Sequence, residues 1–162
     1  MSGSSSWSFR EEDARAIQVI LSGFLGESNA RTALIVDRTG QMVATVGEAP
    51  RFDPTAFASL TAADFSANDQ LARMLGEPEF GALFHQGEKE SMYLADIVKR
   101  VILVVLFDQR TTLGLVKLKG RAVVEQLNKV FEDMFNRVGT GPTSAQKGLL
   151  EGAEDEIDKL FD

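Results

Sequence analysis

The stretch VILVVLF, residues Val101 to Phe107, is apolar at every position. A strand with one face in water alternates apolar and polar side chains, whereas a short unbroken apolar run is typical of a strand covered on both faces. The stretch therefore predicts the central strand of a sheet that carries helices on both sides.

Four other segments have the composition of strands. TALIVD (32–37) and QMVATV (41–46) flank a short RTG turn, and we interpret them as a hairpin in which Gly40 adopts positive φ. GALFHQG (81–87) and ESMYLAD (90–96) precede the central strand and are separated from each other by a polar turn. Together these segments predict one five-stranded, antiparallel-type sheet.

A first helix is predicted before the strands. Ser8 and Glu11 have the spacing of a capping box, in which each side chain satisfies a free backbone N–H of the first turn. An apolar face follows and stops at Gly26, a residue type that often ends helices. We expect this helix to span the interval between these signals.

Two further helices complete the order. Asp53 before Pro54 is a strong helix start, and this middle helix is expected to run to Leu75 and to end at Gly76. The last helix is expected to begin near residues 111–112 and to end before Gly139. The predicted order is α-β-β-α-β-β-β-α, an α/β (α+β) fold.

Composition limits the function classes. The chain has 162 residues and no cysteine, which excludes disulfides, thiol nucleophiles and cysteine metal sites and is usual in a reducing cytoplasm. No apolar run approaches the roughly 18 residues of a membrane span, and no basic stripe suits a phosphate backbone. We expect a cytoplasmic protein that binds neither nucleic acid nor membrane.

The domain organisation follows from these elements. We expect a flexible head at residues 1–8, one domain at 9–138, a flexible linker at 139–150 and an acidic amphipathic helix at 151–162.

The motifs of catalytic and cofactor sites are missing from the sequence. No phosphate-binding loop, dinucleotide-binding turn or nucleophile elbow is present. His85 is the only histidine, and no metal-ligand spacing surrounds it, so we interpret it as a strand residue. We therefore expect no cofactor, no metal and no active site of the protein's own.

The middle helix has apolar or small side chains on two sides. The side expected to face the sheet consists of Phe57, Leu60, Ala67, Leu71 and Leu75. The other side carries Ala62, Ala63, Phe65 and Ser66, where a solvated helix would have Lys and Glu. This second side predicts a homodimer or partner surface, unless the helix is buried within its own domain.

The C-terminal segment is strongly acidic. Residues 151–162 contain six acids and one lysine, which gives −5 of the formal net charge of −7. Ile157, Leu160 and Phe161 fall on one side at helical spacing. The segment is either a solubilising end or a short helix that binds a partner.

Four longer stretches resemble a known family. They are TALIVDRTGQMVA, SLTAADFSANDQLARMLGE, FHQGEKESMYL and VILVVLFDQRTTLGLVKLKG. They and the element order are similar to the Roadblock/dynein light-chain superfamily, and within it to the bacterial MglB proteins, which act on the Ras-like GTPase MglA. The acidic end also resembles the C-terminal helix of those proteins. Asp64, Asn68 and Asp69 depart from the family pattern, which has small or apolar residues there.

The resemblance implies a homodimer that activates one small GTPase and controls cell polarity and gliding motility, with recruitment to a cell pole through partners. The two middle helices would form the platform, without an arginine finger, and Ile157, Leu160 and Phe161 would make a second, regulatory contact, with a role in exchange as one option. Carried over onto this chain, the platform residues are Ala62, Ala63, Phe65, Ser66, Asp69, Gln70 and Arg73. The alternatives are a Roadblock scaffold without effect on GTP turnover and a small-molecule sensor domain.

Overall fold

The computed structural model describes residues 9–139, and their side chains to residue 137. The predicted head at 1–8, the linker from residue 140 onward and the C-terminal helix at 151–162 lie outside the described residues, and their organisation stays a prediction.

The element order is the one that the sequence predicts. The elements are α1 (Glu11–Ser28), β1 (Thr32–Asp37), β2 (Met42–Gly47), α2 (Pro54–Met74), β3 (Ala82–Gln86), β4 (Ser91–Ile97), β5 (Val101–Phe107) and α3 (Leu113–Gly139). The strands form one sheet in the order β2-β1-β5-β4-β3, and every neighbouring pair is antiparallel. The apolar strand β5 is the middle strand of the sheet, which confirms its predicted place.

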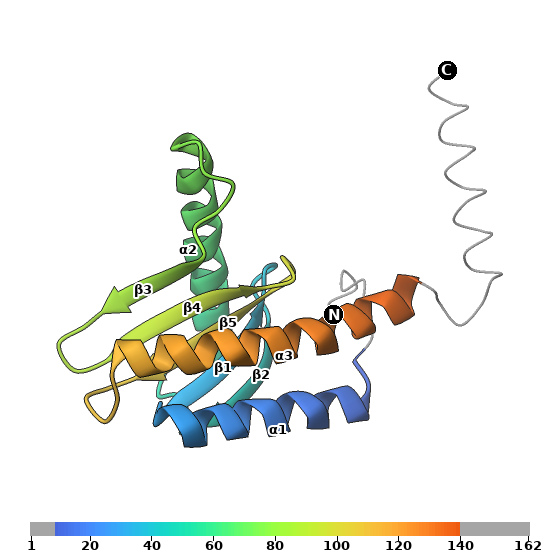
Figure 1. Cartoon of the computed structure of the whole chain (residues 1–162), viewed down its shortest axis with the longest axis horizontal. Helices are drawn as coiled ribbons and strands as arrows, with labels where there is room; N and C mark the ends of the chain where they lie inside the picture. The colour runs from blue at the N-terminus through green and yellow to red at the C-terminus, as the bar shows by residue number, and fades with distance from the viewer. Residues whose placement is uncertain (1–8, 140–162) are drawn as a thin grey trace.

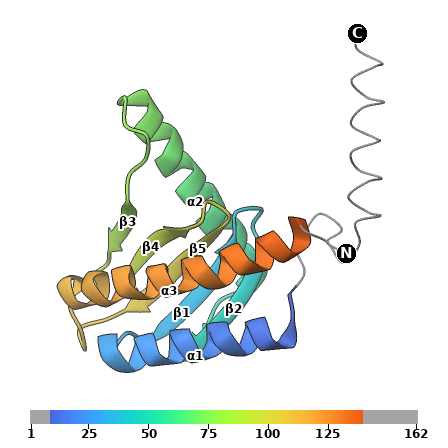
Figure 2. The same cartoon turned by 45° about the vertical axis from the view of Figure 1, so that its right-hand side comes forward.

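The helices cover the two faces of the sheet unequally. Figures 1 and 2 show α1 and α3 side by side across one face and α2 alone on the other. Side chains alternate along a strand, so Ala33 and Ile35 of β1 face α1 and α3, whereas Leu34 and Val36 face α2. The sheet therefore carries two separate cores.

Helix α1 is bounded differently from the prediction. Its N-cap is Arg10, whose backbone N–H donates to the Asp13 carboxylate at 3.0 Å, so the predicted box at Ser8 and Glu11 is wrong. The helix also continues past Gly26 to Ser28 and ends at Asn29, which adopts the left-handed conformation at φ 59°. Asparagine tolerates this conformation, and it therefore replaces glycine as the terminator.

Helix α2 begins as predicted. The Asp53 side chain accepts a hydrogen bond from the Thr55 N–H at 3.2 Å, and Pro54 occupies the first helical position. Phe52 stacks on Phe57 with ring centroids 4.3 Å apart, a hydrophobic staple that fixes the direction in which the chain enters the helix. The helix ends at Met74, and Gly76 takes positive φ just beyond it, as expected from the sequence.

Two hairpin turns place charged residues at one end of the sheet. Gly40 has φ +96° between β1 and β2, which confirms the prediction. Between β4 and β5, Val98 and Lys99 both have positive φ, and the Lys99 N–H donates to the Asp96 carboxylate at 3.0 Å. Arg38 and Asp96 are thereby brought to the same end of neighbouring hairpins. Among residues 9–139 no helix is both long enough and apolar enough to cross a membrane.

Candidate functional site

The side of α2 that faces the sheet is made of small residues around one aromatic ring. Phe65 is 1% exposed and packs against Leu34, Leu94 and Val104. The other buried positions of the helix are Ala58, Thr61, Ala62, Asn68 and Ala72. Small side chains bring the helix backbone close to the strands, so one large ring is enough to fill the interface.

The opposite side of α2 is a continuous apolar surface in water. Leu60 is 71% exposed, Leu71 55% and Met74 82%. With the exposed alanines they recur at helical spacing along one side, and we call them the α2 stripe: Ala56, Leu60, Ala63, Ala67, Leu71 and Met74. Single exposed apolar residues are ordinary, but a contiguous stripe marks an interaction surface.

The predicted orientation of α2 is wrong for most of its large residues. Leu60, Ala67, Leu71 and Leu75, expected against the sheet, are exposed, and only Phe57 of that set is half-buried. The sheet prefers the side with small residues because the helix can approach it more closely there. The large residues therefore face solvent, whereas Ala62 and Phe65, which were expected to face a partner, are buried against the sheet.

The seven residues expected to form the docking platform differ in their exposure. Ala62 and Phe65 are buried on the sheet side of α2, out of reach of a partner. Asp69 is half-buried, and the remaining four, which are exposed, are Ala63, Ser66, Gln70 and Arg73. Their role in docking stays a prediction.

A charged cluster joins α2 to the sheet, and we call it the Arg38 clamp: Arg38, Asp69 and Asp96. The Arg38 guanidinium donates to the Asp69 carboxylate of α2 at 2.6 Å and to the Asp96 carboxylate of β4. It also lies over the Phe65 ring, 5.0 Å from its centroid. Burial opposes the charge on Arg38, but the two carboxylates outweigh it, so the pKa of Arg38 is raised above its ordinary value.

The Arg38 clamp has no recognisable signal in the sequence. Asp69 and Asp96 lie 31 and 58 positions from Arg38. No spacing rule connects residues so far apart, and a lone arginine after a strand usually indicates a solvated turn. Only the hairpin and helix geometry brings the three together.

A second polar contact joins α2 to the edge strand. His85 of β3, in a strand as predicted, lies with its Nε2 atom 2.5 Å from Oδ2 of Asp64 on α2. Both side chains are partly exposed, so the contact is accessible to solvent. Strand β3 is an outer strand of the sheet, with β4 as its neighbour on one side.

The chemistry available on this surface is that of binding. The α2 stripe presents methyl, methylene and thioether groups, which can be buried against a partner but cannot transfer protons. Within the part of the chain that the structure describes, no group of three or more His, Asp or Glu side chains is arranged to hold a metal ion.

The arginines differ in their freedom to reach a partner. Arg110 is held by Asp108 and Glu48, at 3.0 and 2.9 Å. The Arg100 guanidinium lies 4.4 Å from the centroid of the Phe135 ring. Arg73 is exposed in the last turn of α2, next to the α2 stripe.

Comparison with known proteins identifies the family. The Roadblock/LC7 domain model matches residues 16–107. Myxococcus xanthus MglB is 39% identical, with a TM-score of 0.69 and coverage of 72% of this chain and 95% of that chain. The gliding protein MglB of Thermus thermophilus is 32% identical, with a TM-score of 0.73 and coverage of 79% and 97%.

A further structure, described as MglB with a tetrameric arrangement, is 32% identical, with a TM-score of 0.74 and coverage of 80% and 97%. Among curated protein sequences there is no significant match. The domain match spans most of α1, the whole sheet and α2. The three MglB structures are covered over 95%, 97% and 97% of their own length. The chain therefore belongs to the Roadblock/LC7 family.

Proposed function

We propose that the protein is an MglB-type regulator that activates GTP hydrolysis by a Ras-like small GTPase of the MglA type. Two protomers form a homodimer, their α2 helices lie side by side, and one GTPase docks on this pair. The protein works in the bacterial cytoplasm, where it is recruited to a cell pole through partners and controls polarity and gliding motility.

The α2 stripe is the observation that carries this proposal. Burial of a large apolar side chain contributes about 1.5–3 kcal/mol, and Leu60, Leu71 and Met74 are all more than half exposed in the single chain. A surface of this kind is stabilised when another protein covers it. The identity of 32–39% to MglB structures supports a GTPase as that partner.

The exposure of each platform residue indicates its proposed role. Ala63, Ser66, Gln70 and Arg73 would contact the GTPase or the second protomer together with the α2 stripe. Ala62 and Phe65 would contribute indirectly, by seating α2 on the sheet. Asp69 would contribute through the Arg38 clamp, which fixes the half of the helix that carries Leu71 and Met74.

The proposed activation uses no arginine finger. Arg110 and Arg100 are engaged within their own chain, which supports this choice. Arg73 is the exposed arginine of the platform, and a finger at that position would be worth roughly 10³–10⁵ in rate. We expect Arg73→Ala to change the maximal hydrolysis rate by less than about tenfold, as for a residue that only contacts the partner.

The C-terminal segment is proposed as a second, regulatory contact. Ile157, Leu160 and Phe161 lie outside the described residues, but their spacing and the surrounding acids suit a short helix on a partner's groove. Tethering through residues 140–150 would give this weak contact an effective concentration in the millimolar range. The contact would bias the nucleotide state of the GTPase, with nucleotide exchange as one outcome.

The test is single-turnover GTP hydrolysis by a cognate Ras-like GTPase with increasing amounts of the full-length protein. We expect acceleration that saturates near two protomers per GTPase and is lost in Leu60→Glu. Leu118→Glu is the matched control, because Leu118 is 64% exposed but lies on α3, across the sheet. Binding without acceleration would replace this proposal with the scaffold function.

The same assay tests the C-terminal segment. Removal of residues 151–162 should change either the affinity for the GTPase or the rate of turnover. An unchanged affinity and rate would refute the second contact and leave the α2 platform unaffected.

A further inference from the structure

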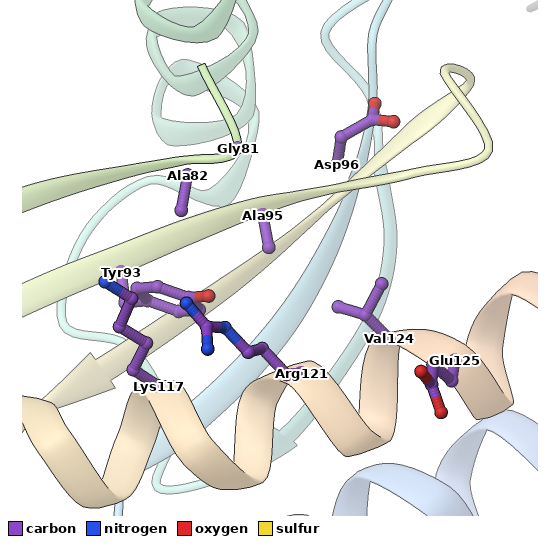
Figure 3. A pocket seen from close by; sticks show the side chains of 9 residues that line it. All are labelled: Gly81, Ala82, Tyr93, Ala95, Asp96, Lys117, Arg121, Val124 and Glu125. Carbon is purple, nitrogen blue, oxygen red and sulfur yellow. The ribbon is translucent and has the colours of Figure 1, made fainter. Parts of the chain in front are cut away.

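A pocket of ≈ 620 Å³ lies on the side of the sheet opposite α2, between the strands β3 and β4 and the helix α3. Its apolar lining includes Ala82, Ala95 and Val124. Figure 3 shows Lys117 and Arg121 reaching from α3 toward Tyr93 on β4. The pocket shares no residue with the α2 stripe, so the proposed GTPase platform does not account for it.

Lys117 and Arg121 place two positive charges on one side of α3. They are four residues apart, so their Cα atoms are separated by one helical turn, about 6 Å. Among the described residues, neither side chain is within ion-pair distance of a carboxylate. Two like charges at this spacing repel each other, and an anion between them would relieve the repulsion.

The acids near the pocket do not neutralise these charges. Asp96 is held by Arg38 in the clamp on the other side of the sheet. Glu125 lies one turn beyond Arg121 on α3 and makes no ion pair with it. The cationic end of the pocket therefore lacks a counter-ion from the described part of the chain.

Tyr93 supplies a fixed hydroxyl beside the two cations. The residue is only 4% exposed, and its hydroxyl has no hydrogen-bond partner among residues 9–137. A Cβ atom at Gly120 would lie 3.1 Å from Cε1 of Tyr93, so this glycine allows α3 to press on the ring. The hydroxyl oxygen is not closed off from solvent, so a ligand oxygen that enters the pocket can accept a hydrogen bond from it.

The electrostatics of Tyr93 agree with this arrangement. Burial raises the pKa of the Tyr93 hydroxyl, and the nearby Arg121 charge partly offsets that rise. The phenol is therefore protonated at neutral pH and available as a donor.

We propose that this pocket binds a small organic anion, whose carboxylate or phosphate group lies between Lys117, Arg121 and the Tyr93 hydroxyl. The guanidinium and the ammonium donate to the anion oxygens, and the phenol O–H donates to a third position. The short apolar part of the ligand lies on Ala82, Ala95 and Val124. A volume of ≈ 620 Å³ is in the range of small-molecule sites and is lined on opposite sides by sheet and helix.

Tyr93 also provides the probe, because it is the only tyrosine in the chain. Full-length protein with 3-fluorotyrosine gives a single ¹⁹F signal at this pocket. Titration with inorganic phosphate and, separately, with succinate should shift the signal along a saturating curve. Sodium chloride at equal ionic strength should give only a small, unsaturated change. A response to phosphate and succinate that is no larger than the response to chloride would overturn the proposal.

Substitutions locate the anion. Arg121→Gln and Lys117→Gln should each weaken binding by about tenfold or more, because each removes a charged hydrogen-bond donor. Lys119→Gln is the matched control, since it removes the same charge from the same helix at a residue that pairs with Glu27 instead. Equal affinities in all three variants would overturn the site. All three side chains are at the surface, so circular dichroism should show unchanged folding.

A final arm distinguishes a free anion from an acidic side chain of the same chain. In the variant Glu154→Gln, Asp155→Asn, Glu156→Gln, an unchanged affinity supports a free small anion as the ligand. A clear gain in affinity for phosphate and succinate would show that the chain's own carboxylates occupy the pocket when no anion is added, which overturns a free anion as its resident ligand. Neither result depends on a GTPase, so this proposal can fail while the proposed function stands.

Discussion

The two faces of the sheet are built on different principles. On one face, α1 and α3 lie together over a core with seventeen buried members among the described residues, from Ile17 to Met134. On the other face, α2 lies alone over a core with seven, supplemented by the Arg38 clamp. The first face has the larger apolar core, whereas on the second face a smaller apolar core is joined by a charged cluster that ties α2 to the sheet.

The α1 and α3 side therefore provides stability, whereas the α2 side provides a binding surface. The deep core on the α1 and α3 side provides most of the hydrophobic stabilisation, because that term grows with the apolar area buried. Helix α2 can therefore keep large apolar residues in water at Leu60, Leu71 and Met74 without unfolding the domain.

The largest effect is expected in the deep core. Phe131 of α3 is fully buried, and Phe131→Ala should lower the free energy of unfolding by roughly 3–5 kcal/mol through lost contacts and a cavity. Leu118→Ala on the same helix is exposed and should change it by less than about 0.5 kcal/mol. Urea denaturation measures both, and similar values for the two variants would contradict the assignment of the core to this face.

Two neighbouring alanines separate the two sides of α2. Ala62→Glu forces a charge against the sheet and should lower the free energy of unfolding by roughly 2–3 kcal/mol. Ala63→Glu places the same charge in the α2 stripe and should leave it within about 0.5 kcal/mol. Chemical denaturation gives these values, and sedimentation together with GTPase binding reports on docking. We expect Ala63→Glu to lose docking while its stability is unchanged. A clear loss of stability in Ala63→Glu would contradict the assignment of Ala63 to the exposed side of α2.

The Arg38 clamp should contribute less than either core. Arg38→Met leaves Asp69 and Asp96 without their shared partner and should lower the free energy of unfolding by roughly 1–2 kcal/mol, since all three groups keep some contact with water. Arg15→Met breaks a fully exposed pair with Glu11 and serves as the control, with an effect below about 0.5 kcal/mol. If both variants unfold at the same urea concentration, α2 is seated by apolar packing alone.

The smallest effect belongs to the exposed ion cluster at the other end of β1. Hydrogen bonds from Arg110 and then Arg31 lower the pKa of Glu48 below its ordinary value of 4.5. Because the folded-state pKa is the lower one, this stabilisation is present above pH 4.5 and is lost as pH falls through the folded pKa. The thermal midpoints of wild type and Glu48→Gln should therefore differ slightly at pH 6 and converge below pH 4.5. A difference that grows on acidification would reverse this sign.

The sequence was sufficient for elements whose signals are local. The unbroken run at 101–107 predicted the middle strand, Asp53 and Pro54 predicted the start of α2, and Gly40 predicted a turn with positive φ. Each signal depends on residues that are neighbours in the chain, so periodicity and capping chemistry describe it fully. The Roadblock resemblance drew on the same stretches and is confirmed by the domain match at 16–107.

The orientation of α2 and both clusters of distant residues could not be predicted in the same way. Helix α2 carries two apolar sides, and periodicity alone cannot tell which one the sheet accepts. The choice depends on how closely Ala58 and Ala62 allow the backbone to approach the strands. The Arg38 clamp and the pocket at Tyr93 unite side chains from separate elements, which only the three-dimensional fold brings together.

The small number of buried contacts between α2 and the sheet also affects the dynamics of the helix. Elements with few buried contacts open locally at a lower free energy than the core does, and their amides exchange with solvent faster. We expect hydrogen exchange in α2 to outpace that in β1 and β5, which are buried on both faces. A partner that binds α2 only when the helix is packed on the sheet would bind with lower apparent affinity, because a fraction of the molecules has the helix detached. Binding of this partner would also slow hydrogen exchange throughout α2. The Arg38 clamp would then set the fraction of molecules in which α2 is packed on the sheet and able to bind a partner.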